Sequence, residues 1–235
     1  MVGALTRAMT LAAVAVVLTA LAPLAFAGRP FVTEDAGIIA PGRCEVESFA
    51  AYAASRDDPA ERGVSLQVAC GIGVNTQLAL QGEYYGSEGT HRTMGSFNGK
   101  TALRPLTDME TGVAVAYALR GTGLPDSSFR HEESNIVLVV SVPLERTVVH
   151  ANLGVVRTQS DGRTAGAYAL LVERLGESGL DFGVEAFGEF NKAPWVGTGV
   201  RYAVKPETFF IDASARVQTD SARTRQFTLG VKYAF

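Results

Sequence analysis

Histidine, cysteine and serine are the residue types here that could supply a general base, a metal ligand or a nucleophile. The 235-residue chain has three histidines and two cysteines, and His131 with Ser134 is the nearest pairing of a base with a nucleophile. The sequence lacks the Gly-x-Ser-x-Gly turn that presents a hydrolase serine, and its histidines and cysteines lack metal-site spacing. We therefore expect no catalytic residue, no metal and no cofactor. Lipid hydrolysis by His131 and Ser134 is the enzymatic alternative.

The two cysteines, Cys44 and Cys70, lie on either side of a polar stretch centred at Asp57. Residues equidistant from the centre of a hairpin lie opposite each other. Both numbers are even, so the two side chains share the strand face of Val46 and Leu66. We predict a cross-strand disulfide, which would stabilise the fold by roughly 3 kcal/mol through loop entropy. Two buried free thiols are the alternative.

The first 27 residues have the three parts of a secretory signal peptide. Arg7 precedes the apolar run 11–21, and an Ala-Phe-Ala cleavage site ends at Ala27. A membrane-spanning helix needs about 20 apolar residues, and Pro23 interrupts this run too early. We expect cleavage after Ala27 and export, which would provide the oxidising compartment that a disulfide needs.

The rest of the chain has the two-residue period of β-strands. Towards the C-terminus, Phe227, Leu229 and Val231 alternate with polar or small residues, and no second long apolar run follows residue 43. The net charge of -3 also excludes a basic nucleic-acid surface. We expect about twelve strands, at 44–54, 63–71, 74–85, 95–104, 111–120, 134–142, 147–158, 164–175, 179–190, 195–204, 207–217 and 225–235.

Two kinds of connection alternate between these strands. Short turns, such as those at 71–73 and 143–146, alternate with mostly longer polar loops, such as those at 55–62, 86–94 and 121–133. Short turns therefore share one end of the structure and longer loops share the other. This arrangement indicates an all-β, up-and-down antiparallel β-barrel over residues 43–235.

Three features favour a barrel whose apolar face contacts lipid. Only 19% of residues are charged, which is low for a soluble domain. Many aromatic residues lie near strand ends, as Tyr52, Tyr84 and Trp195 do near the loops and Tyr202 near the turns. The chain also stops on this face, at Phe235. An even strand number would place the short turns in the periplasm and the loops outside the cell.

The end of the last strand, 227–235, resembles the C-terminal strand of bacterial outer-membrane barrels, which ends in an aromatic residue read by the barrel-assembly machinery. Tyr233 and Phe235 match that assembly signal. The resemblance implies an outer-membrane location, with membrane lipids and the assembly machinery as partners.

The residues after the cleavage site are similar to the opening of an outer-membrane transporter family labelled meta-pathway of phenol degradation. Its members begin with Arg-Pro, a Thr-x-Asp-Ala-Gly segment and a Gly-x-x-Glu-x-Glu first strand. Here these are Arg29-Pro30, 33–37 and 42–47, and Gly71-Ile72-Gly73 resembles the family's glycine-centred turn. The similarity covers the first quarter of the chain and implies passage of aromatic compounds. The sequence departs from the family at Cys44, where an apolar residue is usual.

The polar strand faces would line the lumen of such a barrel. Neighbouring opposite charges are expected to pair across strands, with Glu185, Arg201, Asp212 and Lys232 as the set. Twelve strands enclose a lumen between filled and open barrels, so these residues either plug it or line a narrow channel. The lumen-lining candidates are Gln77, Gln81, Lys100, Arg104, Glu185, Arg201, Asp212 and Lys232.

Residues 28–42 form a separate N-terminal segment with two open locations, the periplasm or the lumen. Its acids Glu34 and Asp35 could bind a cation, although such a leader is more often solvated, while Phe31 and Ile38 favour burial. The expected function is passive passage of small, aromatic or hydrophobic solutes. A plugged structural or adhesive barrel is the second alternative, beside the lipid hydrolase.

Overall fold

The computed structural model describes residues 30–56, 58–123 and 129–235. The proposed signal peptide and the hairpin centre at Asp57 lie outside these residues. Within them, no helix is long and apolar enough to cross a membrane. The strands are β1 (Cys44–Ala54), β2 (Glu61–Gly73), β3 (Thr76–Ser87), β4 (Thr90–Arg104), β5 (Gly112–Gly123), β6 (Arg130–Leu144), β7 (Thr147–Thr158), β8 (Thr164–Arg174), β9 (Leu180–Glu189), β10 (Trp195–Lys205), β11 (Phe209–Gln218) and β12 (Arg225–Ala234).

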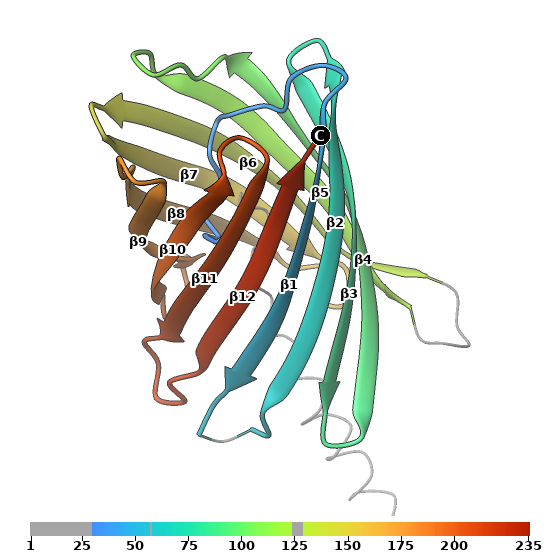
Figure 1. Cartoon of the computed structure of the whole chain (residues 1–235). Helices are drawn as coiled ribbons and strands as arrows, with labels where there is room; N and C mark the ends of the chain where they lie inside the picture. The colour runs from blue at the N-terminus through green and yellow to red at the C-terminus, as the bar shows by residue number, and fades with distance from the viewer. Residues whose placement is uncertain (1–29, 57, 124–128) are drawn as a thin grey trace, which may run out of the picture.

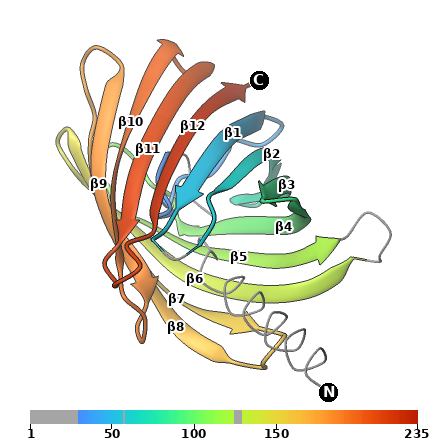
Figure 2. The same ribbon diagram turned by 90° about the horizontal axis from the view of Figure 1, so that it is seen from below.

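The strands form a closed antiparallel barrel, as the sequence predicts. Each strand pairs with its neighbours in sequence, and β1 pairs with β12 to close the ring (Figures 1 and 2). We call the end that holds the C-terminus the turn end, and the opposite end the loop end. In Figure 1 the turn end is at the top.

Two connections differ from their predicted lengths. The loop expected over 86–94 is a two-residue turn at Glu88 and Gly89, because β3 and β4 continue to pair as far as Ser87 and Thr90. Strand ends that extend beyond the apolar zone can be polar on both faces, so hydropathy does not mark them. The loop expected over 121–133 is also shorter, because β5 continues to Gly123 and β6 begins at Arg130.

Side chains alternate between the two faces of the barrel wall over most of each strand. On β12, Phe227, Leu229 and Val231 are exposed on the outside, whereas Gln226 and Thr228 are buried inside. Large hydrophobic residues on the outer face of a closed barrel are typical of a wall surrounded by lipid. The aromatic residues near strand ends mostly follow this pattern, with Tyr52, Tyr84 and Tyr202 all at least 40% exposed.

Trp195 is an exception to the expected aromatic belt. It shares the inward face of β10 with Gly197, Gly199 and Arg201, and its ring stacks on the buried Phe187 at 6.2 Å. Its residue type predicts a position at the membrane–water interface, but the strand register directs this side chain into the barrel.

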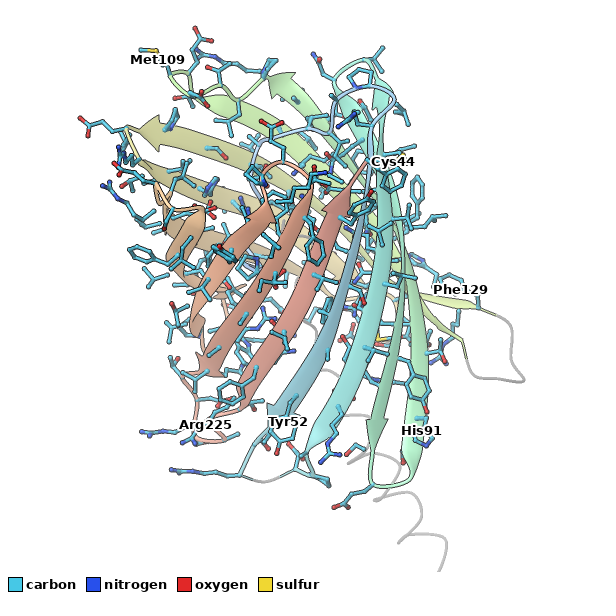
Figure 3. The ribbon with its side chains drawn as sticks, viewed as in Figure 1. Cys44, Tyr52, His91, Met109, Phe129 and Arg225 are labelled. Atoms are coloured by element: carbon cyan, nitrogen blue, oxygen red, sulfur yellow. A yellow bond between two sulfur atoms is a disulfide. The ribbon has the colours of Figure 1, made fainter. Side chains whose placement is uncertain are left out.

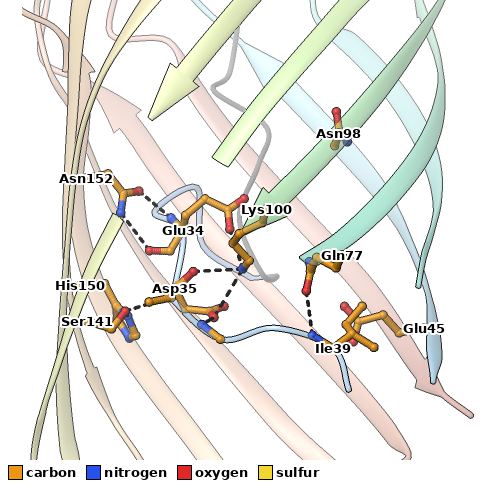
Figure 4. Close-up of polar contacts among 12 residues, drawn as sticks. Glu34, Asp35, Ile39, Glu45, Gln77, Asn98, Lys100, Ser141, His150 and Asn152 are labelled. Atoms are coloured by element: carbon orange, nitrogen blue, oxygen red, sulfur yellow. Dashed lines mark hydrogen bonds and ion pairs between the residues drawn. The ribbon is translucent and has the colours of Figure 1, made fainter. Parts of the chain in front are cut away.

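Residues 30–43 lie against the inner wall at the turn end, and we call them the inner segment (Figures 1 and 4). Phe31, Val32 and Ala36 are buried there. Ala36 belongs to an apolar cluster with inward residues of β5 and β6, and Val32 belongs to a second one with Ala169 and Phe187. The sequence leaves two locations open for this segment, and in the structure residues 30–43 lie in the lumen.

Candidate functional site

The inner wall of the barrel is the candidate functional site, and its side chains hold the inner segment mainly through backbone groups. Glu185 on β9 accepts hydrogen bonds from the backbone N–H groups of Val32 and Thr33, at 2.9 and 3.0 Å, and from the Thr33 hydroxyl at 3.0 Å. Asn152 on β7 both accepts from the Glu34 N–H, at 2.7 Å, and donates to its carbonyl, at 2.9 Å (Figure 4). These bonds satisfy backbone groups that no strand pairs.

Further anchors follow along the inner segment towards the turn end. The Ala36 N–H donates to the Ser141 hydroxyl at 2.9 Å, and the Ile39 N–H donates to the Gln77 side chain at 2.9 Å (Figure 4). The segment then joins the wall, where Gly42 donates to the carbonyl of Gly71 at 3.0 Å. The inner segment is therefore tied to β2, β3, β6, β7 and β9.

Glycines in the wall leave room for the first residues of the inner segment. A Cβ atom at Gly183 would lie 2.7 Å from the Phe31 ring, and one at Gly199 would lie 2.8 Å from the same ring and 2.9 Å from Pro30. These distances are too short for a side chain. The fit of Phe31 against β9 and β10 thus depends on both glycines.

Lys100 on β4 contacts both acids of the inner segment. Its ammonium lies 3.1 Å from a Glu34 carboxylate oxygen, 3.5 Å from that of Asp35 and 3.0 Å from the Asp35 carbonyl (Figure 4). Glu34 is buried, which corrects the expectation of a solvated leader. The leader's apolar neighbours, including Phe31, draw it into the barrel, and Lys100 offsets the cost of burying charge.

The two acids respond in opposite directions to this environment. Burial raises the pKa of Glu34 to about 8, although the Lys100 ammonium lowers it. Burial also acts to raise the pKa of Asp35, but Lys100 and the Gly37 N–H outweigh it, and the pKa falls to about 2. At neutral pH Glu34 therefore holds its proton, whereas Asp35 stays ionised.

The remaining predicted lumen residues have separate partners. Lys232 contacts Glu45 at 2.6 Å and Glu47 at 3.6 Å, and Arg201 lies opposite Asp212 and 4.0 Å from Glu173. Glu185 contacts the inner segment, so these four residues do not act as one cluster. Gln81 donates to Ser65 and Glu83, at 3.0 and 2.8 Å.

Arg104 does not line the lumen. Its side chain is 57% exposed at the turn end and lies 3.9 Å from Glu110. A register shift between Ala102 and Arg104 breaks the inward alternation of β4 just before this residue. The even-number pattern that places Lys100 inside therefore fails for Arg104.

The ion pairs in the half of the barrel near the loop end were not predicted from the sequence. Arg120 on β5 pairs with Glu83 on β3, and both are buried. Arg92 contacts Glu61 at 3.0 Å and lies over the Tyr85 ring at 4.9 Å. Strand parity could have found these residues, because all of them fall on the inward face.

Acidic side chains outnumber basic ones on the inner wall. The acidic residues are Glu45, Glu47, Glu61, Glu83, Glu133, Glu173, Asp181, Glu185, Glu189 and Asp212, to which the inner segment adds the ionised Asp35; the basic ones are Arg92, Lys100, Arg120, Arg201, Arg216 and Lys232. The lumen therefore has an excess of negative charge.

Space remains between the inner segment and the wall. A cavity of about 280 Å³ is lined by Glu34, Asp35, Gln67, Asn98 and Lys232, among others. The buried Oδ1 atoms of Asn98 and Asn135 accept no hydrogen bond from residues that the structure describes. Buried polar atoms of this kind are normally satisfied by water, so the inner surface suits a hydrated lumen.

Cys44 and Cys70 lie opposite each other on β1 and β2 and form a disulfide with a Cα–Cα distance of 4.1 Å. At the same end, the rings of Tyr233 and Phe235 stack at 5.8 Å. No group of three histidine, cysteine, aspartate or glutamate side chains in the described part of the chain could hold a metal ion.

His131 and Ser134 are close together but poorly arranged for catalysis. Both lie on β6 and are accessible, and the His131 Nε2 is 3.0 Å from the Ser134 hydroxyl and 2.9 Å from the Glu133 carbonyl. A nitrogen that donates to this carbonyl carries a proton and cannot accept one from serine.

Solved outer-membrane barrels share this fold at low sequence identity. The KdgM porin in complex with disordered oligogalacturonate matches with a TM-score of 0.63 and 8% identity, over 81% of this chain and 99% of that one. An outer membrane channel from Pseudomonas putida F1 matches with a TM-score of 0.61 and 9% identity, over 86% and 98%. Outer membrane phospholipase A from Escherichia coli matches with 0.52 and 11%, over 86% and 93%.

At these identities the structures show the fold and nothing finer. No curated protein matches the sequence. The model of a family described as "Uncharacterised conserved protein UCP029691" matches residues 14–235, and the chain therefore belongs to that family.

Proposed function

We propose that the chain is an outer-membrane channel for passive passage of small solutes, narrowed by its inner segment at the periplasmic side. The observation that carries this proposal is the opposite character of the two wall faces. The outside is apolar, as at Leu229 and Val231, and the inside is charged and closed into a ring. Only a barrel surrounded by lipid needs an apolar outer face and a polar inner face.

Export and assembly complete the proposal. Cleavage after Ala27 would release the chain into the periplasm, where Cys44 and Cys70 can oxidise. The aromatic C-terminal strand with Tyr233 and Phe235 would be recognised by the barrel-assembly machinery, and membrane lipids would surround the wall.

The lumen favours neutral or cationic solutes over polyanions. Its excess of carboxylates repels negative charge. The inward faces of β5 and β8 are also largely apolar, with Ala114, Ala116 and Ala118 on one and Ala169 and Leu171 on the other. These two apolar patches are separated by β6 and β7, and Ala36 and Val32 of the inner segment pack on them. Such patches suit the aromatic or hydrophobic solutes implied by the similarity to the phenol-degradation family.

The decisive experiment is single-channel conductance of refolded protein, residues 28–235, in a planar bilayer. It is compared with a variant lacking 28–42. We expect steps in both, larger after deletion, and a lower permeability for chloride than for potassium. Silence from both proteins would overturn the channel proposal in favour of a plugged structural or adhesive barrel. Because the deletion could impair folding, heat-dependent gel mobility of both proteins is the control for barrel formation.

Lipid hydrolysis is a weaker second function, raised by the His131–Ser134 contact and by the shared fold of the phospholipase. No third side chain among the described residues orients His131 by a hydrogen bond. We expect no phospholipid hydrolysis above that of Ser134→Ala. Activity that disappears in this variant would establish the enzyme instead.

A further inference from the structure

The outer wall carries a groove that the channel function does not use. It has a volume of about 960 Å³ and extends over β8 to β12, close to the loop end. Its lining includes Leu170, Val184, Val196, Ala215 and Phe227, all on the outward strand face.

Small side chains surrounded by larger ones make this groove. Ala186 lies between Leu170 and Val196 in the strand register, and Ala215 lies between Thr198 and Phe227. The short side chains form the floor and the long ones form the sides. An apolar depression of this shape fits an acyl chain better than the smooth wall does.

Two arginines border the groove at the loop end. Arg223 and Arg225 are both exposed and both belong to its lining, and Arg225 is labelled at this end in Figure 3. Neither side chain forms an ion pair with a residue in the described ranges. Asp220, the nearest acid in this loop, accepts a hydrogen bond from the Arg223 backbone N–H at 2.9 Å. Exposed arginines beside an apolar groove suit a ligand that is anionic at one end and apolar along its length.

We propose that this groove binds an acyl chain of a phosphorylated lipid of the outer leaflet, whose phosphate contacts Arg223 and Arg225. The inference rests on the proposed membrane location and on loops that face the cell exterior. It does not depend on whether the lumen conducts. Phosphate is favoured because guanidinium groups bind it through two parallel hydrogen bonds.

The test is native mass spectrometry of the refolded chain in detergent with added diphosphorylated lipid A. The variants are Arg223→Gln, Arg225→Gln and their combination. Arg157→Gln is the matched control, because Arg157 is an exposed arginine on the outward face of β7 near the loop end, outside the groove lining. We expect about tenfold weaker lipid retention in each single variant and about a hundredfold weaker retention in the double variant, since one charge-assisted contact contributes about a factor of ten. The control should match the parent.

A second variant tests the acyl chain separately from the phosphate. Ala215→Phe fills the floor of the groove without changing charge, and we expect it to weaken retention of lipid A as well. Equal loss in Arg157→Gln would show diffuse charge attraction and overturn the site. Unchanged lipid retention in both the double arginine variant and Ala215→Phe would also overturn the site. Dimers that are present in the parent and disappear in Ala215→Phe would assign the groove to a second copy of the chain instead.

Discussion

Replacing Asn152 by leucine tests how the inner segment is held in the barrel. The substitution removes both hydrogen bonds between this side chain and the backbone of Glu34, at 2.7 and 2.9 Å. Each neutral hydrogen bond contributes about 1 kcal/mol, so docking of the segment should weaken by about 2 kcal/mol. This corresponds to a roughly thirtyfold increase in the ratio of undocked to docked segment. The assay is the fraction of time spent at the higher conductance in single-channel recordings.

Asn98→Leu is the matched control for this experiment. Asn98 faces the lumen from β4 and donates to Gln67 and Gln81 at 3.2 and 3.4 Å, with no hydrogen bond to the inner segment among the described contacts. It should leave the high-conductance fraction within about twofold of the parent. An Asn152→Leu channel that behaves like the parent would refute the anchoring role. An equal increase in both variants would attribute the effect to an altered lumen surface.

Three further predictions follow from the same contacts. The pKa of Glu34 is raised to about 8 in the docked segment, so its contribution to docking is complete below about pH 4.5 and is lost as the pH rises through about 8. Conductance should therefore increase from pH 6 to pH 9, and Glu34→Gln should remove that pH dependence. Replacing Cys44 and Cys70 by alanine should lower the free energy of unfolding in urea by about 3 kcal/mol, and an unchanged urea midpoint would contradict this loop-closure argument. Gly199→Val should displace Phe31 and raise conductance, whereas the same change at Gly82, where a Cβ meets nothing within 4 Å, should not.

Much of the fold was readable from local pattern. Alternation at Phe227, Leu229 and Val231 defines a strand with one apolar face, and short turns alternating with loops define the meander. The odd–even alternation along each strand also predicted that Lys100 and Glu185 lie on the inner face of the barrel. Local pattern failed where the physical environment changed along a strand. Strand ends past the apolar zone, as at Thr90, lost the hydropathy signal, and a register shift turned Arg104 outward.

Local sequence pattern therefore predicts which residues form strands, which face of each strand is apolar and which two cysteines lie opposite each other. These properties depend on neighbours a few residues away or on symmetry about a hairpin. The path of residues 30–43 and the partners of Glu34 depend on the folded barrel, because those contacts join positions such as Glu34 and Asn152, 118 residues apart. The outer groove depends on the folded barrel as well, because it arises from small side chains on adjacent strands. Contacts of this kind depend on barrel closure and curvature, which no local periodicity contains.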